Sequence, residues 1–251
     1  MVQDLPEWYR EKRRDVTKTF ARAEPGERTQ HFSHSGRCWL EVTRFSTGPN
    51  TWAYSRGRVF AGTSEHPLAV VDRNFGPFPF SWSEDHPSGH DYLVCGEDYQ
   101  GQTVIELDTG RRVDHIDAAA EAGWGFCWVA HYPAPCGRWL FVEGCVWAAP
   151  YELVLFDFSA PLVLPYPELG RWPIHTVHGW QADGSFVFEY TVEVRRSDDV
   201  PLDELSEEER DAVELSASYR ELVRERRYRA GWRTGQPAEM TPVYYAPALA
   251  R

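Results

Sequence analysis

The sequence contains no run of about 18 consecutive apolar residues, the length that a membrane-spanning helix needs. Its start, residues 1–20, carries the charged run Glu11 to Asp15 and has neither the apolar stretch nor the small-residue cleavage site of a secretory signal. Basic residues are also few, since 26 Lys and Arg stand against 38 Asp and Glu. The resulting net charge of −12 repels phosphate backbones and anionic lipids. These absences predict a cytoplasmic protein that binds neither nucleic acid nor membranes.

Cysteine is scarce, and familiar catalytic motifs are missing. The five cysteines are an odd number without a C-x-x-C pair, which favours buried thiols over a disulfide framework. No G-x-S-x-G elbow marks a serine nucleophile, and no cysteine has an identifiable histidine partner. Gly123-Trp124-Gly125 lacks the Lys-Ser/Thr that follows a phosphate-binding loop. The sequence therefore names no reaction directly.

Aromatic residues, by contrast, are abundant and recur regularly: they make up 14% of the chain, with 11 Trp. Four segments share an apolar stretch, a polar turn that ends in Gly, and an aromatic residue that opens a short β-prone run. The turns end at Gly36, Gly89, Gly137 and Gly184, and the runs open at Trp39, Tyr92, Trp139 and Phe186. This interval of about 48 residues is typical of propeller blades.

We therefore expect an all-β fold, a small β-propeller-like domain of about four blade repeats that spans residues 1–251. The repeats lie near 28–75, 76–118, 124–168 and 172–251. Two segments depart from the β pattern. Asp4 with Glu7 resembles a capping box and predicts a helix over 4–20. Ser206 with Glu209 and an apolar stripe through Val223 predict a helical insertion over 203–230 in the last repeat.

The second repeat resembles the repeats of TolB-type and WD-type propellers. Its Trp82-Ser83, Pro87-Ser88-Gly89 and Tyr92-Leu93 match a turn that precedes a strand, and Leu107-Asp108-Thr109-Gly110 matches the close of the next hairpin. Residues 96–101 and 144–152 look like recurring loops of uncharacterised bacterial propeller-like proteins. The resemblance is good for repeats two and three, fair for the first and poor for the fourth after Val192. It implies a scaffold for binding and supplies no catalytic residues.

The first, third and fourth repeats carry histidine at one equivalent position of their first strand, and the second repeat carries Trp82 there. The histidines are His31, His131 and His178. If the first strands line a central axis, three imidazoles can converge on a divalent metal such as Zn, Fe, Mn or Cu. The alternative is that each histidine only forms hydrogen bonds with a neighbouring blade.

Aromatic and acidic residues are expected to gather on one face, where first strands begin and second strands end. The first set holds Phe75, Phe78, Trp124 and Trp172, and the second holds Glu97, Asp98, Tyr99, Trp147, Tyr151 and Glu152. Rings beside carboxylates suit a small cationic or amphipathic ligand. The expected ligand-binding residues are Trp82, Glu97, Asp98, Tyr99, Trp124, Trp147, Tyr151 and Glu152. The rings could instead simply seal the ends of the blades.

Three functions stay open from the sequence. The leading prediction is a binding protein whose aromatic and acidic face takes a ligand, a peptide or a protein. The second is a metal-dependent enzyme that uses His31, His131 and His178, with Glu97 or Glu152 nearby. The third is an immunity or assembly factor, for which the net charge of −12 favours a basic protein partner.

Overall fold

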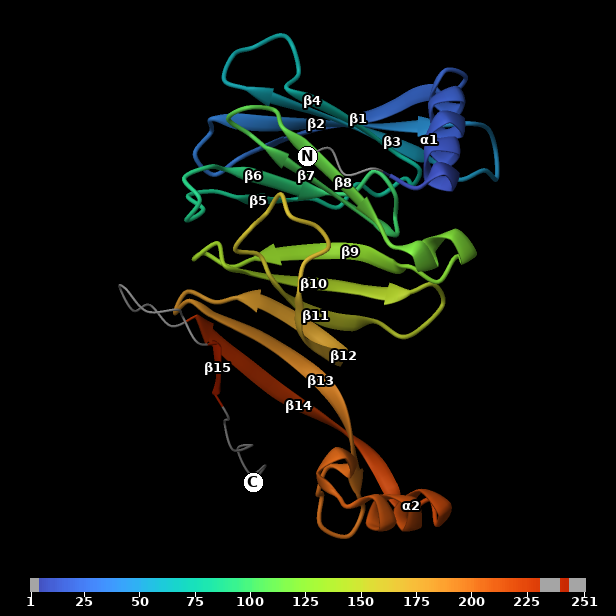
Figure 1. Cartoon of the computed structure of the whole chain (residues 1–251), viewed down its shortest axis with the longest axis vertical. Helices are drawn as coiled ribbons and strands as arrows, with labels where there is room; N and C mark the ends of the chain where they lie inside the picture. The colour runs from blue at the N-terminus through green and yellow to red at the C-terminus, as the bar shows by residue number, and fades with distance from the viewer. Residues whose placement is uncertain (1–4, 231–239, 244–251) are drawn as a thin grey trace. The chain divides into compact units, whose positions relative to one another are not determined.

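The structure, a computed structural model, describes residues 5–230 and 240–243. The chain divides into two compact units, Met1–Arg171 and Trp172–Arg251, where the sequence led us to expect one domain. Both units consist mainly of antiparallel strands that follow one another as meanders (Figure 1). In the part of the chain that the structure describes, these meanders are open and no sheet closes. The all-β class is therefore confirmed, whereas a propeller is not supported.

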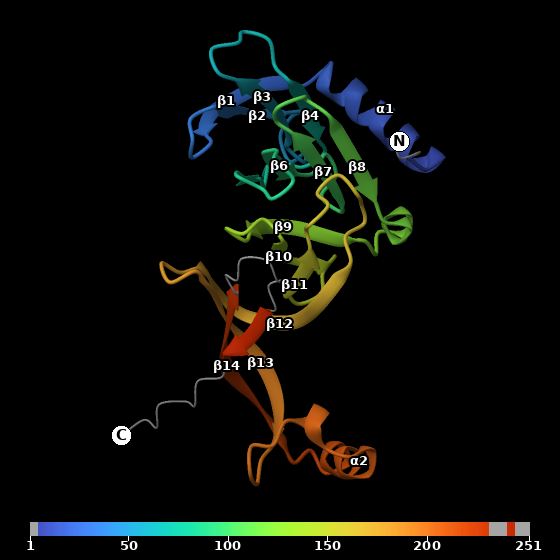
Figure 2. The same cartoon turned by 60° about the vertical axis from the view of Figure 1, so that its left-hand side comes forward.

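The first unit contains three sheets in chain order. Its first sheet comprises β1 (Glu24–Phe32), β2 (Cys38–Ser46), β3 (Tyr54–Ala61) and β4 (Ala69–Arg73). The second comprises β5 (Ser81–Ser83), β6 (Tyr92–Cys95), β7 (Gly101–Glu106) and β8 (Arg112–Ile116). Strands β9 (Phe126–Pro133), β10 (Trp139–Val146) and β11 (Glu152–Asp157) form the third, and the short helix η1 (Ala118–Ala122) leads into it. Helix α1 (Glu7–Phe20) lies beside β4 and β8 (Figure 2).

The two middle strands of the second sheet are buried on both faces, which explains the uninterrupted apolar run of β6, Tyr92 to Cys95. All residues of β6 and β7 are buried. On one face Leu93 and Ile105 pack against the first sheet, and on the other Val94 and Val104 pack against the third. A strand that is covered on both sides cannot alternate apolar and polar residues. The three sheets thus stack around two apolar layers.

The glycine turns that define the repeat adopt one conformation. Gly36, Gly89, Gly137 and Gly184 have φ angles of 68°, 85°, 71° and 76°, in the left-handed region that favours glycine. Each glycine N–H donates to the carbonyl oxygen three residues earlier, at 2.8–3.0 Å. Each turn is followed by a strand: β2, β6, β10 and β13 (Ser185–Arg195). The predicted turn and strand of all four repeats are confirmed.

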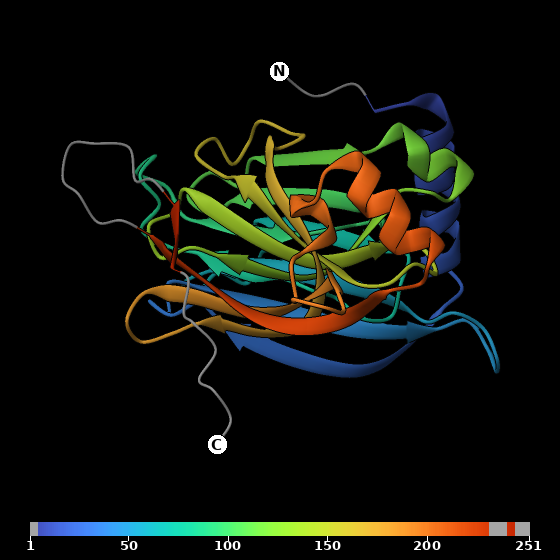
Figure 3. The same cartoon turned by 90° about the horizontal axis from the view of Figure 1, so that it is seen from below.

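The second unit shows where a helix prediction was wrong. Its strands are β12 (Glu168–Trp180, which begins in the first unit), β13, β14 (Tyr219–Ala230) and β15 (Met240–Val243), with short helices η2 (Leu202–Glu204) and α2 (Glu207–Leu215). The capping box of Ser206 and Glu209 is present, but α2 ends at Leu215. Residues 219–230 are not helical, because they pair with β13 along its whole length as two long curved strands (Figure 3). The N-terminal helix begins at Glu7 after Pro6, and Asp4 lies outside the described residues.

A buried arginine joins the first two sheets. Arg73, at the end of β4, is 2% exposed and donates hydrogen bonds to three backbone carbonyls. Its Nε donates to Pro77 O at 2.8 Å, and its Nη1 donates to Gly96 O at 2.6 Å and to Asp98 O at 3.1 Å. Burial lowers the pKa of Arg73 to about 10, so the side chain still carries its charge at neutral pH. The guanidinium therefore fixes the segment after β4 to the loop after β6.

We predict that Arg73→Leu lowers the free energy of unfolding by about 2–4 kcal/mol, because three carbonyls lose their donor in a buried place. Urea unfolding followed by tryptophan fluorescence measures the change. Arg111→Gln, at an exposed turn, is the control and should stay within about 0.5 kcal/mol of the native chain. A loss for Arg73→Leu no larger than that of the control would contradict the role of Arg73.

Candidate functional site

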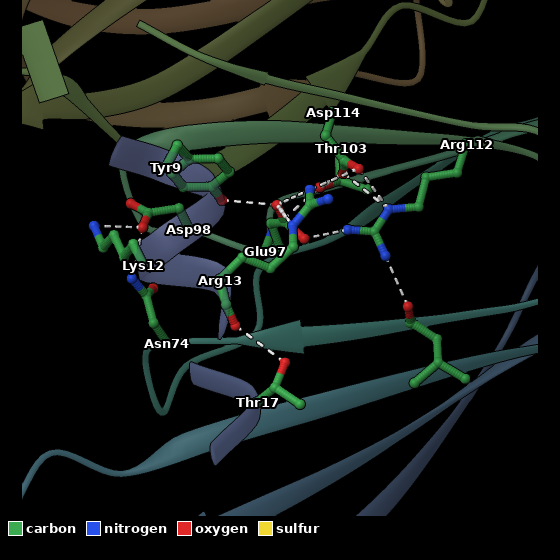
Figure 4. Close-up of polar contacts among 11 residues, drawn as sticks. Tyr9, Lys12, Arg13, Thr17, Asn74, Glu97, Asp98, Thr103, Arg112 and Asp114 are labelled. Atoms are coloured by element: carbon green, nitrogen blue, oxygen red, sulfur yellow. Dashed lines mark hydrogen bonds and ion pairs between the residues drawn. The ribbon is translucent and has the colours of Figure 1, made fainter. Parts of the chain in front are cut away.

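Glu97 and the cations of α1 form a charged network at one end of the second sheet (Figure 4). Glu97 is 9% exposed. Its Oε1 accepts hydrogen bonds from Tyr9 Oη at 2.8 Å and Arg13 Nε at 3.0 Å. Its Oε2 pairs with Arg112, whose Nε also donates to Asp114 at 2.9 Å. Burial and then the charge of Glu97 raise the pKa of the Tyr9 hydroxyl, so Tyr9 stays protonated and donates a hydrogen bond to Glu97.

Asp98, the next residue, is likewise paired with a cation of α1. Its carboxylate lies 2.6 Å from Lys12 Nζ and accepts a hydrogen bond of 2.6 Å from Asn74 Nδ2, and the residue is 1% exposed. The cationic ligand was expected to pair with Glu97 and Asp98, but both carboxylates already bind cations of the same chain. The structure therefore gives no support to this part of the predicted ligand face: the two residues hold α1 against the sheets.

A hollow of about 240 Å³ lies between α1 and the strands. Its charged lining is balanced, with Lys12, Arg13 and Arg112 against Asp72, Glu97 and Asp98. Lys12 Nζ also lies 5.4 Å from the centre of the Tyr99 ring. Each of these charged side chains has a partner of opposite charge. The residues that line the hollow therefore attach the helix, and among them no charged group is left unpaired for a ligand.

Four rings from all three sheets of the first unit meet in what we call the aromatic cluster: Trp52, Phe75, Tyr99 and Trp147. Trp52 lies 5.2 Å from Phe75 and 6.1 Å from Trp147, measured between ring centres. Tyr99 closes the cycle, 6.1 Å from Phe75 and 5.6 Å from Trp147. Trp52 is 59% exposed and Trp147 is 49% exposed. The expectation that Phe75, Tyr99 and Trp147 gather is met by these distances.

Trp52 was missed by the sequence reasoning, although it lies in the equivalent loop. Trp52, Tyr99 and Trp147 all lie between the second and third strands of their sheets, in residues 47–53, 96–100 and 147–151. The first of these loops is longer, so a fixed count from the leading aromatic does not reach Trp52. The connection between the second and third strand of each repeat is the signal that could have found it.

Within the described residues, the remaining predicted ligand residues make no ring contact with the aromatic cluster. Trp82 packs on the apolar layer between the first and second sheets. Trp124 is 67% exposed and has no ring contact among the described residues. Tyr151 is exposed, and Glu152 pairs with Arg171 at 2.5 Å. Two residues of the wider predicted face are also packed elsewhere: Phe78 lies against Gly57, and Trp172 contacts Phe188 in the second unit.

The three predicted metal ligands have separate surroundings. His31 lies 4.9 Å from the Phe80 ring and 3.0 Å from Thr29 Oγ1. His178, in the second unit, lies 3.3 Å from Glu189. His131 is buried on Trp128, and neither of its ring nitrogens has a hydrogen-bond partner in the described part of the chain. Among residues 5–230 and 240–243, no group of three or more His, Cys, Asp or Glu side chains is placed to hold a metal ion. The structure gives no support to a three-histidine metal site.

Comparison with known proteins finds a similarity to a viral protein. The chain is similar to an uncharacterised protein of Acanthamoeba polyphaga mimivirus, with 34% identity over 137 residues. The match covers 55% of this chain and 53% of the viral protein, so the chain spans about half the length of that relative. No family model matches, and no solved structure matches. None of the described helices is long and apolar enough to cross a membrane.

We predict that Glu97→Gln loosens α1, because Arg13 and Arg112 lose the carboxylate that pairs with both. Trypsin should then cut after Lys12, Arg13 or Arg14 at least about tenfold faster than in the native chain, as local opening exposes these bonds. Mass spectrometry of the timed digest measures the rate. Glu11→Gln, which changes an exposed carboxylate of the same helix, is the matched control. Equal rates for the two variants would contradict the anchoring role.

A second prediction concerns His131. Burial, and then the charge of Arg73, lower the pKa of His131 to about 3, below the value of about 6.5 in an unfolded chain. Between these two values the unfolded state binds the extra proton, so stability falls as the pH drops below 6.5, by up to about 1.4 kcal/mol per pH unit.

From pH 7.5 to pH 5 the native chain should therefore lose about 2 kcal/mol more than His131→Leu. Urea unfolding at the two pH values tests this. At pH 7.5 His131→Leu should be at least as stable as the native chain, because the ring nitrogens are buried without partners. An identical pH dependence in the two proteins would show that His131 is not buried in its neutral form.

Proposed function

We propose that this chain is a binding protein whose contact surface is the aromatic cluster. The observation that carries the proposal is the meeting of Trp52, Phe75, Tyr99 and Trp147 from three sheets while both tryptophans stay about half exposed. Exposed apolar patches of this kind mark interaction sites, and Trp and Tyr dominate the energy of such contacts.

The loops hold the rings in place before any ligand binds. Thr47 Oγ1 donates to Thr51 Oγ1 at 2.8 Å, and Thr51 Oγ1 donates to Gly48 O at 2.8 Å, which braces the loop that carries Trp52. Tyr99 O accepts a hydrogen bond of 3.0 Å from Trp128 N of β9. A surface that is ordered in advance loses less conformational entropy on binding. This order supports a binding role over rings that merely cap the ends of the strands.

An amphipathic ligand fits this surface better than a purely cationic one. Glu97, Asp98 and Glu152 are engaged by Lys12, Arg13, Arg112 and Arg171. The rings therefore supply most of the contact, through stacking and the hydrophobic effect. No observation favours the metal-dependent enzyme, and we do not propose it.

The test uses 2-naphthylmethanol, a neutral ring with one hydroxyl, titrated against tryptophan fluorescence and saturation-transfer NMR. Trp52→Ala and Trp147→Ala should each weaken binding about 2- to 10-fold, since an aromatic contact contributes about 0.5–1.5 kcal/mol beyond burial. Trp124→Ala removes a tryptophan that is more exposed than either of these and makes no ring contact with the aromatic cluster, and it should bind as the native chain does. The proposal fails if the first two variants bind normally or if Trp124→Ala is weakened as much.

A further inference from the structure

A second hollow, of about 390 Å³, opens beside Trp52 on the surface of the first unit. Its lining combines two rings, Trp52 and Phe75, with the polar side chains of Asn50 and Thr51 and one charged residue, Arg44. No carboxylate lies in this lining. The hollow therefore adds a cationic edge to one side of the aromatic cluster.

Arg44 differs from the neighbouring arginines because it has no partner. It is exposed, and within the part of the chain that the structure describes its side chain has no hydrogen bond or ion pair. Arg56 pairs with Asp72 at 2.5 Å, and Arg13 and Arg112 pair with Glu97. A guanidinium presents five donors in a planar fork, which matches the oxygens of a carboxylate, sulfate or phosphate group.

The position of Arg44 on its strand directs it to the hollow. Residues two apart in a strand share a face, so Arg44 continues the face of β2 on which Leu40 and Val42 pack toward the second sheet. Gly76 lies beside it, where a Cβ atom would be 3.7 Å from Arg44 Nε and 3.1 Å from Ala53 Cβ. Glycine at this position leaves the space next to the guanidinium open.

Asn50 provides a second unused donor. It occupies the left-handed region, with a φ of 58°, and its exposed side-chain amide has no hydrogen bond among the described residues. The Thr51 hydroxyl, by contrast, is already used inside the loop. Two unpaired donors therefore face a hollow that holds no acceptor of opposite charge.

Resting on the proposed binding function, we infer that the ligand is a ring-bearing anion whose acidic group pairs with Arg44 while its flat apolar part packs on Trp52. The net charge of −12 does not oppose this. At physiological ionic strength charges beyond about 8 Å are largely screened. Among the described residues, Arg44 is the charged residue in the lining of the hollow.

The experiment compares three probes with one ring system: 2-naphthoate, 2-naphthylmethanol and 2-naphthylmethylammonium. We expect the anion to bind the native chain about 3- to 10-fold more tightly than the neutral probe, and the cation to bind most weakly. Arg44→Gln should remove the advantage of 2-naphthoate and leave the affinity for 2-naphthylmethanol unchanged. Trp52→Ala should weaken all three probes.

Arg111→Gln is the matched control, since it removes the same charge from the β7–β8 turn, at the other end of the second sheet from Tyr99. It should bind each probe as the native chain does. If the probes bind equally, or if Arg111→Gln acts as Arg44→Gln does, the inference is overturned. The proposed function still stands in that case, provided that Trp52→Ala weakens binding. If Trp52→Ala has no effect, or no probe binds, both are overturned.

Discussion

The buried guanidinium of Arg73 is the contact on which the candidate surface depends. It donates to carbonyl oxygens of Pro77, Gly96 and Asp98, which belong to the segment after β4 and the loop after β6. Phe75 lies within the first segment and Tyr99 lies within the second, so one side chain fixes the backbone beneath two rings of the aromatic cluster. A buried charge is stable only when its donors are satisfied. The three carbonyls accept the hydrogen bonds of the guanidinium, and these bonds fix the positions of the carbonyls. The same charge also helps to keep His131 neutral.

The use of the acidic residues follows from this arrangement. The loop that Arg73 holds places Glu97 and Asp98 next to α1. Tyr9 and Arg13 of the helix bind Glu97, and Lys12 binds Asp98. Carboxylates that satisfy buried cations cannot also bind a cationic ligand without leaving those cations unpaired, which is costly. The charges of Glu97 and Asp98 are thus neutralised by cations within the first unit. What faces outward is the set of rings, together with Arg44, whose side chain has no ion pair within the described residues.

The sequence predicted the parts of the fold that depend on local chemistry. The four glycine turns, the strands that follow them and the capping box at Ser206 could be predicted because each needs a specific residue at a specific place. Leu222 and Val223 were assigned to a helix because the spacing of the apolar residues in this segment fits the period of a helix as well as that of a strand. Only the pairing with β13 shows that the segment is a strand. The surroundings of the histidines and of Glu97 could not be predicted for a related reason. Their roles depend on which distant residue lies opposite, such as Tyr9 for Glu97, and no local pattern contains that information.

The repeat explains why the aromatic cluster exists and where it ends. The loop between the second and third strand contributes one ring from each of the first three repeats: Trp52, Tyr99 and Trp147. Stacking of the sheets brings equivalent loops together. One ring in this loop of each repeat is therefore enough to produce a continuous aromatic surface. The fourth repeat has residues 196–218 in the corresponding connection, and this segment contains α2 and no aromatic residue. The contact surface is therefore a property of the first unit, and changes in α2 should not alter the set of rings that compose it.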